Sequence, residues 1–240
     1  MRGRLLRRIG IGLLVLLAGA YGLHRLSGAE CFQLVGEVHC RVDTDQKLVA
    51  LTFDDGPIPP GVEMVLPILD AHGTKATFFL VGEAMQRNPG LARRMLEAGH
   101  ELGNHSYTHK RLLLRMPSTY EQEVGATDAL LRAEGVESPT LFRPPFGKRL
   151  LGLSLAVDNA GYRTIMWDVE EGVGLTDPRE YADIILDGVQ PGSIVLMHPM
   201  FGHREVISKA LPLIIEGLEE RGYTMVTVSE LLAGGGVGDE

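Results

Sequence analysis

Residues 51–57, LTFDDGP, join an apolar strand-like run to two adjacent acids and a Gly-Pro turn. Asp54 and Asp55 place like charges side by side, and aspartate is a poor strand former. One interpretation is structural, because Asp-Gly-Pro is favourable turn chemistry and acids at the end of a strand are well solvated. The other is functional, and it requires further reactive side chains at the ends of neighbouring strands.

Beyond residue 46 the sequence alternates apolar β-type runs with helical stretches and shows no repeats. Asn88 with Pro89 predicts the start of one helix, and Asp177 with Pro178 the start of another. Apolar runs predict strands at Leu48–Phe53, Ala76–Val81, His100–Gly103, Leu141–Arg143, Tyr162–Trp167, Ser193–Met197 and Thr224–Thr227. The alternation predicts an α/β fold with a parallel sheet, either a βα barrel or a doubly wound sheet.

Chemically capable motifs follow most of these strands. After the acid pair come NHSYTH (104–109), RPPFG (143–147), WDVEE (167–171) and LMHP (196–199). In a βα barrel the carboxyl ends of the strands meet on one rim, so these motifs would converge. Turn preference alone does not explain such a convergence, and the functional interpretation of the acid pair gains support.

The residue types indicate metal chemistry. His105 and His109, four residues apart, can bind one divalent ion with a carboxylate as the third ligand. A thermolysin-type site would need glutamate after the first histidine, but Ser106 stands there. One acid of the pair would therefore bind the metal and the other would take a proton from water, with Arg143 as a countercharge. His198 can protonate a leaving group.

The charge of the chain is unevenly distributed. Its 240 residues suit one large domain, and its formal charge is −8. The first 25 residues contain five basic residues and no acid: Arg2, Arg4, Arg7, Arg8 and Arg25. Removing these five from −8 leaves −13 on the remainder, which would repel nucleic acid phosphates. A nucleic acid partner is therefore excluded.

The N-terminal region predicts export. An apolar run, Ile9–Leu23, follows four arginines and fits an export signal, and an uncleaved membrane anchor is equally compatible. The protein is expected outside the cytoplasmic membrane, either anchored and facing outward or secreted. The only two cysteines, Cys31 and Cys40, follow this run, and outside the cytosol a local disulfide between them is expected.

TFDDGP, HSYTH, RPPFG and LMHP resemble the successive motifs of the polysaccharide deacetylase family (carbohydrate esterase family four, the nodulation-factor deacetylase homology domain). The resemblance covers residues 47–232 and implies a single catalytic domain folded as a distorted (β/α)7-8 barrel. The rest of the chain divides into a signal peptide or membrane anchor (1–29), a lead-in segment (30–46) and a flexible tail (233–240).

The resemblance also implies roles for the acids and histidines. Asp54 would be the general base, held by Arg143. Asp55, His105 and His109 would bind a divalent metal, for which zinc is the first choice and cobalt or nickel are alternatives. Water activated by this metal would attack the carbonyl of an N-acetyl group on a sugar.

The remaining roles concern the substrate and the leaving group. By the resemblance, the backbone N–H of Phe146 would stabilise the oxyanion, Trp167 would contact the substrate and His198 would protonate the departing amine. The fourth motif departs from the family pattern, which leaves Asp168 and Glu170 as candidate partners of His198. Phe146 stands where the family commonly has tyrosine.

The sequence therefore predicts a metal-dependent N-deacetylase of an N-acetylated glycan such as peptidoglycan, poly-N-acetylglucosamine or a chitin-like polymer. Two alternatives stay open: an O-acetyl esterase on xylan-like polymers, and a glycan-binding pseudoenzyme that keeps the fold without turnover. The oligomeric state is not indicated by any sequence pattern.

Overall fold

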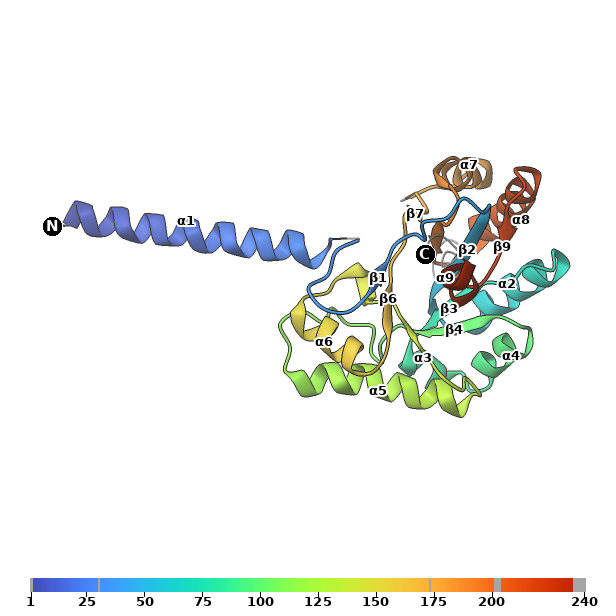
Figure 1. The fold of residues 1–240 in the computed structure, drawn as a ribbon, viewed down its shortest axis with the longest axis horizontal. Coiled ribbons are helices and arrows are strands. Elements are labelled where there is room, and N and C mark those ends of the chain that lie inside the picture. The colour runs from blue at the N-terminus through green and yellow to red at the C-terminus, as the bar shows by residue number, and fades with distance from the viewer. Residues whose placement is uncertain (1, 30, 173, 201–203, 235–240) are drawn as a thin grey trace, which may run out of the picture.

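A computed structural model of the protein describes residues 2–29, 31–172, 174–200 and 204–234. A curled parallel sheet carries helices on its outer side, and one long helix, α1 (Arg2–Ser27), extends away from this body (Figure 1). The predicted barrel-like α/β domain is confirmed. The predicted tail, residues 233–240, lies outside the described residues from position 235 onward.

All neighbouring strands in the sheet are parallel. The strands are β1 (Val38–His39), β2 (Leu48–Gly56), β3 (Thr77–Leu80), β4 (Glu101–Asn104), β5 (Leu141–Phe142), β6 (Arg163–Ile165), β7 (Val169–Glu170), β8 (Ile194–Met197) and β9 (Thr224–Met225). They follow the order β1-β6-β5-β4-β3-β2-β8-β7, and β9 also pairs with β2. All seven predicted strands are present. The two-residue strands β1 and β7 were not predicted, because so short a run has no period.

The sheet curls because one short stretch of chain, residues 163–170, contributes strands near both edges of the sheet. β6 pairs with β5 and β1, and after three residues the chain continues as β7, which pairs with β8. The lead-in segment reinforces this closure. Arg41 forms an antiparallel bridge with Ser193, and the Val42 N–H donates to the Gly192 carbonyl at 2.9 Å.

Helices follow the strands, and two of their starts test the sequence signals. The remaining helices are α2 (Pro59–Ala71), α3 (Gly82–Arg87), α4 (Leu91–Glu97), α5 (Pro117–Ala133), α6 (Leu151–Asn159), α7 (Pro178–Gly188), α8 (Arg204–Glu220) and α9 (Val228–Gly234), with a 3-10 turn η1 at Pro145–Gly147. Asp177 caps α7 by accepting from the Arg179 N–H, as predicted. The prediction for Asn88 is wrong: its amide donates to the Ala84 and Pro57 carbonyls and ends α3 instead.

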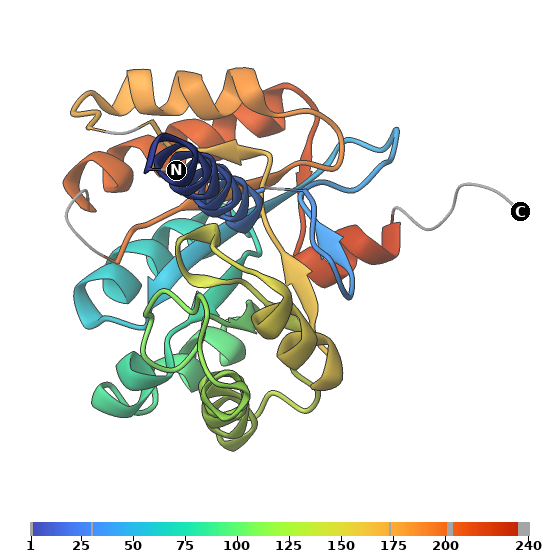
Figure 2. The same cartoon turned by 90° about the vertical axis from the view of Figure 1, so that its left-hand side faces the viewer.

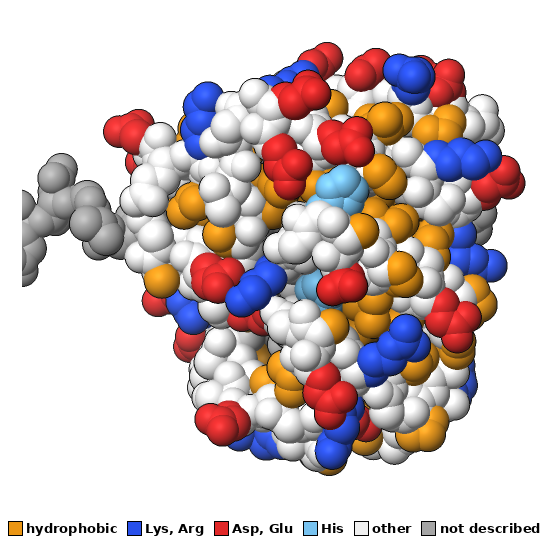
Figure 3. All heavy atoms as spheres, turned by 90° about the vertical axis from the view of Figure 1, so that its right-hand side faces the viewer, with side chains coloured by type: hydrophobic (Ala, Val, Ile, Leu, Met, Phe, Trp, Pro, Cys, Tyr) orange, Lys and Arg blue, Asp and Glu red, His pale blue; other side chains and the backbone are white. Residues whose placement is uncertain are grey.

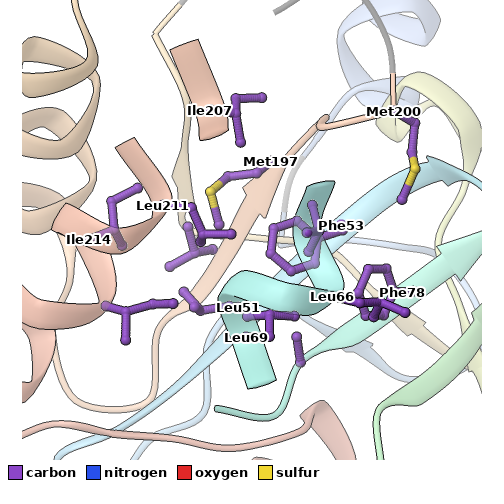
Figure 4. Packing of buried hydrophobic residues seen from close by; sticks show 14 of the residues in the cluster. Leu51, Phe53, Leu66, Leu69, Phe78, Met197, Met200, Ile207, Leu211 and Ile214 are labelled. Atoms are coloured by element: carbon purple, nitrogen blue, oxygen red, sulfur yellow. The ribbon is translucent and has the colours of Figure 1, made fainter. Parts of the chain in front are cut away.

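The main hydrophobic core lies between the sheet and the helices α2 and α8. Alternation along β2 sends Leu51 and Phe53 outward into this layer, where Met197 of β8 joins them (Figure 4). The helices contribute Leu66 and Leu69 from α2, and Ile207, Leu211 and Ile214 from α8. All of these side chains are buried. Leu66 is 6 % exposed, and the others are fully enclosed.

The other face of β2 looks into the barrel. Ala50 packs there in a smaller apolar cluster that also contains Phe79, Leu141, Ile165 and Ile194, with Val228 and Leu231 of α9. Thr52 and Asp54 are the next residues on that face of β2, and both are buried. The barrel interior is therefore apolar at the end covered by α9 and polar toward the carboxyl ends of the strands.

Charged side chains of both signs are interspersed on the outer surface, as Figure 3 shows for the face opposite the side from which α1 extends. No large single-sign region is visible on that face.

The N-terminal helix is longer than the apolar run seen in the sequence. Residues Arg7–Ser27 of α1 are long and apolar enough to cross a membrane, judged by length and composition. At 1.5 Å per residue they span about 31 Å, close to a bilayer core. The loop that follows contains a disulfide between Cys31 and Cys40, whose Cα atoms are 5.6 Å apart.

Gly192 supplies the first test of the fold. Its φ is +82°, and a Cβ there would lie 1.8 Å from the Val42 carbonyl oxygen. We expect Gly192→Ala to lower the free energy of unfolding by about 3 kcal/mol or more, through backbone strain plus this clash. Gly161 is the matched control, because its φ is +77° and an added Cβ would meet no atom within 4 Å.

Gly161→Ala should cost only the strain, about 1–2 kcal/mol. Urea unfolding followed by circular dichroism measures both variants. Equal losses would show that the contact between the lead-in segment and β8 does not support the barrel.

Candidate metal centre and active site

The predicted residues line one hollow at the carboxyl ends of the strands. Its volume is about 350 Å³, and its walls are formed by Asp54, Asp55, His105, His109, Phe146, Gly147, Trp167, Glu170, Leu196 and His198. These residues come from the ends of β2, β4, β6, β7 and β8 and from η1. The barrel therefore brings the separate sequence motifs together.

Asp55, His105 and His109 form a compact donor set. Asp55 Oδ1 lies 2.9 Å from His109 Nε2 and 3.5 Å from His105 Nε2. All three donor atoms lie within 4.8 Å of one another. Two imidazoles and one carboxylate in this arrangement are a typical three-ligand set for a catalytic divalent ion.

The hydrogen bonds around this set fit a metal. His105 Nδ1 donates to the Arg143 carbonyl oxygen at 2.7 Å, which leaves the lone pair on Nε2 facing Asp55. Asp55 Oδ1 is buried and has no hydrogen-bond partner of good geometry among the described residues. Burial alone would raise the pKa of Asp55, but the two facing imidazoles hold it well below its usual range. An ionised, unsatisfied oxygen beside two imidazole nitrogens suits a divalent cation.

The turn that carries the histidines is fixed by Asn104 and Glu123. The Asn104 side chain accepts from the Ser106 N–H and donates to the Val124 carbonyl of α5. The Glu123 carboxylate, also on α5, accepts from the backbone N–H groups of residues 107 and 108 and from the Thr108 hydroxyl. These bonds hold a turn in which Ser106 has a φ of +64° and His109 one of +54°.

Arg143 separates the roles of the two adjacent acids. It is fully buried inside the barrel and donates to Asp54 Oδ1 and to Thr52 Oγ1, both at 2.8 Å. It also donates to the carbonyls of Ile165 and Met166. Burial lowers the pKa of the guanidinium, while the Asp54 charge acts in the opposite direction. Asp54 is thus oriented by a cation from inside the barrel, and Asp55 faces the histidines.

The partner of His198 differs from the predicted one. His198 Nδ1 lies 2.7 Å from Glu171 Oε1, and the His198 backbone N–H donates to Glu171 Oε2. Asp168 instead accepts from Ser193 and Ile194, and Glu170 accepts from the Trp167 indole. The pairing of the short strand β7 with β8 decides which of these acidic side chains faces His198. This register could not be predicted from the sequence.

Glu171 accepts a further hydrogen bond that fixes its position. The Tyr181 hydroxyl of α7, buried in the outer core, donates to Glu171 Oε2. Burial would lower the pKa of His198, but the hydrogen bond to Glu171 and the charges of Asp54, Glu171 and Asp55 raise it to about 9. The same contact, despite burial, lowers the pKa of Glu171. The raised pKa favours the protonated form of His198, which is the form that can donate a proton.

Aromatic residues form two sides of the hollow. The Phe146 ring lies 4.9 Å from the His109 ring, and its backbone has a φ of +57°. Trp167 lies on the other side, over the Arg143 guanidinium at 5.6 Å. The structure thus places Phe146 beside the candidate metal ligands and Trp167 beside the buried Arg143.

Sequence reasoning missed four residues that shape this site: Asn104, Glu123, Glu171 and Tyr181. Asn104 and Glu171 lay within quoted motifs, but Glu123 and Tyr181 are on helices and have no motif of their own. A buried acid in mid-helix gives no local signal, because its partners come from a turn 15 residues earlier.

Comparisons with known proteins identify the family to which this chain is similar. The sequence profile of the family described as polysaccharide deacetylase matches residues 41–165. A peptidoglycan-N-acetylglucosamine deacetylase of Bacillus cereus is 36 % identical over 206 residues, which cover 82 % of this chain and 93 % of the relative. A bifunctional xylanase/deacetylase of Pseudobutyrivibrio xylanivorans is 34 % identical over 80 % of this chain, which spans only 32 % of that larger protein.

Solved structures show the same fold. A peptidoglycan N-acetylglucosamine deacetylase in complex with a hydroxamate-type benzamide superposes with a TM-score of 0.77 at 29 % identity, covering 82 % of this chain and 94 % of the other. A pseudoenzyme of carbohydrate esterase family four from Bacillus anthracis gives the same TM-score at 29 % identity, covering 84 % and 70 %. An acetyl xylan esterase of Clostridium thermocellum with a cobalt ion gives 0.72 at 33 %, covering 78 % and 91 %.

The two adjacent acids should differ in their effect on metal binding. Asp55→Asn replaces a charged ligand by a neutral amide, and we expect the zinc affinity to fall by more than the ~10–100-fold typical of changes outside the ligand shell. Asp54→Asn keeps all three ligands and should stay within that range. Isothermal titration of the metal-free protein with zinc measures both. Equal losses would contradict the division between the two acids.

The neighbouring glutamates provide a second matched pair. Glu171→Gln removes the carboxylate that stabilises the His198 cation, so we expect the pKa of His198 to fall from about 9 toward its ordinary value of 6.5. Glu170→Gln should leave it in place, because Glu170 contacts Trp167. Titration of the His198 ring signals by NMR reports the pKa. A shift in the Glu170 variant but not in the Glu171 variant would overturn the assignment of the partner.

Proposed function

The chain belongs to the polysaccharide deacetylase family and is a hydrolase, and from this premise we propose that it removes N-acetyl groups from peptidoglycan outside the cytoplasmic membrane. The observation that carries the proposal is a complete set of side chains around one hollow. Three metal ligands, an acid held by a buried arginine and a protonated histidine held by a glutamate all line or adjoin it.

The donor set fits a divalent metal, and we propose zinc. Asp55, His105 and His109 would hold the ion, with cobalt or nickel as substitutes for the same ligands. When bound, such an ion acidifies a coordinated water and polarises the carbonyl of the acetyl group.

Asp54 is the proposed general base. Its Oδ1 accepts a hydrogen bond from Arg143, which fixes the orientation of the carboxylate. Its Oδ2 lies 3.6 Å from His105 Nε2, on the side of the metal ligands. Asp54 is thereby supported as the group that accepts the proton of the attacking water.

His198 is the proposed general acid. Amide hydrolysis expels a poor leaving group unless the nitrogen is protonated, and a histidine that holds its proton at neutral pH can supply it. Glu171 and Tyr181 support this role, because they fix the ring and favour its cation. Phe146 would contribute its backbone N–H to the developing oxyanion, and Trp167 would form a wall for the substrate.

The similar proteins support an N-acetylated glycan as the substrate. Peptidoglycan deacetylases are among both the sequence relatives and the solved structures. The similar proteins described as a xylanase/deacetylase and an acetyl xylan esterase support a second candidate function, an O-acetyl esterase on a xylan-like polymer. The predicted export, with α1 as a signal or an anchor, favours cell wall over plant polymer, because peptidoglycan lies just outside the membrane.

Acetate release is the direct test. We expect the zinc-loaded protein to release acetate from peptidoglycan and from N-acetylglucosamine oligomers, and to lose this activity on chelation. Asp54→Asn should lower kcat by about 10²–10⁴-fold while zinc binding persists, because only the proton acceptor is removed. Acetylated xylan is the competing substrate in the same assay.

The outcomes separate the candidates. Release from xylan alone would replace the N-deacetylase with an O-acetyl esterase. Absence of release from all three substrates, by folded protein that still binds zinc and glycan, would assign the chain to the pseudoenzymes.

A further inference from the structure

Exposed apolar side chains of the body are concentrated in three segments. Outside α1, the described part of the chain exposes eight large hydrophobic side chains. Two of them are Phe146 in the hollow and Ile184 on α7. The other six are Phe32 and Leu34 of the lead-in segment, Leu114 and Met116 of the loop between β4 and α5, and Leu151 and Leu155 of α6. Such clustering marks an interaction surface rather than chance exposure.

These three segments lie on the side of the body from which α1 extends. In Figure 1, α6 and the loop leading into α5 form the edge of the body nearest to α1, and Figure 2 looks along α1 onto them. The Arg149 N–H donates to the Ser27 carbonyl at 2.8 Å, which ties the end of α1 to the start of α6. Leu26 of α1, Phe32, Leu34 and Leu151 also share one shallow hollow.

The loop between β4 and α5 adds positive charge to this side. Its sequence KRLLLRM, residues 110–116, contains three basic residues and no acid, in a chain whose remainder after the N-terminal arginines carries −13. Lys110, Arg111 and Arg115 are exposed, and none forms an ion pair with another described residue. The Arg111 guanidinium lies over the Phe146 ring at 5.0 Å.

Leu114 is held in an unfavourable backbone conformation. Its φ is +50°, which is rare for a bulky residue, and its side chain is 81 % exposed. The other non-glycine residues with positive φ in the described chain are Asp55, Ser106, His109 and Phe146, all in or beside the catalytic hollow. Strain of this kind persists where function requires it, and at Leu114 it turns an apolar side chain toward solvent.

We propose that this surface, the six apolar and three basic side chains named above, rests on the outer face of the membrane that an uncleaved α1 spans. Apolar side chains beside lysine and arginine are the composition of a surface that lies at the headgroup level of an anionic bilayer. A bilayer is favoured over a protein partner because α1, which is apolar over Arg7–Ser27, leaves the body on this same side.

The placement has a consequence for the active site. Arg111 is one of the three basic residues of the proposed membrane-contacting surface. Its guanidinium lies over the ring of Phe146, which lines the catalytic hollow. The hollow is therefore held close to the bilayer, within reach of glycan strands that run next to the membrane. This inference concerns the orientation of the body and is independent of the reaction at the hollow.

Fluorescence quenching by lipid tests the proposal on the full chain. Leu114→Trp and Leu151→Trp variants are reconstituted in vesicles of phosphatidylglycerol and phosphatidylcholine with brominated acyl chains. We expect both new indoles to lose most of their emission relative to vesicles without bromine. Ile184→Trp is the matched control, an apolar side chain of α7 that is also partly exposed, and it should not be quenched. The native Trp167 gives a constant background, measured on the unaltered chain.

The result that overturns the proposal is quenching at positions 114 and 151 no greater than at position 184. Circular dichroism first shows that each variant is folded.

The double change Lys110→Glu with Arg115→Glu, in the Leu114→Trp background, should weaken the quenching in anionic vesicles and leave it unchanged in purely zwitterionic ones. An equal effect in both would remove anionic headgroups from the proposal. Efficient disulfide formation between copies of a Leu114→Cys variant, without lipid quenching of Leu114→Trp, would assign the surface to self-association instead.

Discussion

The ion pair between Arg143 and Asp54 is the interaction on which the active site depends. A fully buried guanidinium is costly unless its donors are satisfied, and here they bind one carboxylate, one hydroxyl and two carbonyls. These acceptors belong to β2, to the last residue of β6 and to the residue after it. Arg143 directly follows β5, so its side chain joins three strands of the barrel. Removal of one partner would leave an uncompensated charge, typically at a cost of about 3–5 kcal/mol.

The same pair explains how two adjacent acids avoid mutual repulsion. Asp54 continues the alternation of β2 and points into the barrel, toward a cation. Asp55 has a φ of +72°, which breaks the strand geometry and turns its carboxylate to the histidines. Each carboxylate therefore has its own positive partner, an arginine for one and a metal for the other in the proposed function. The sequence LTFDDGP needs its turn after the acids because the chain must leave the strand there.

Much of this was predictable from the sequence, for physical reasons. Strands with strongly apolar runs, such as β2, β3 and β8, are recognised because they are buried on both faces. The convergence of the strand-end motifs follows from the barrel rule alone. The partner of His198 was predicted wrongly, because Asp168, Glu170 and Glu171 are nearly consecutive and only the register of β7 against β8 decides which one faces the histidine. Glu123 and Tyr181 were missed since their contacts are long-range.

Fold and chemistry occupy different layers of this molecule. The core that stabilises the barrel lies outside the sheet, between β2, β8, α2 and α8, and none of the proposed catalytic or metal-binding residues belongs to it. The polar groups lie inside the barrel and on its rim. Loss of a proposed metal-binding histidine of the rim would leave the outer core and the Arg143–Asp54 ion pair intact, so the fold would persist without activity. A shared backbone alone does not establish an activity, so the case for catalysis by this chain rests on the ion pairs and hydrogen bonds of the rim together with its similarity to known deacetylases.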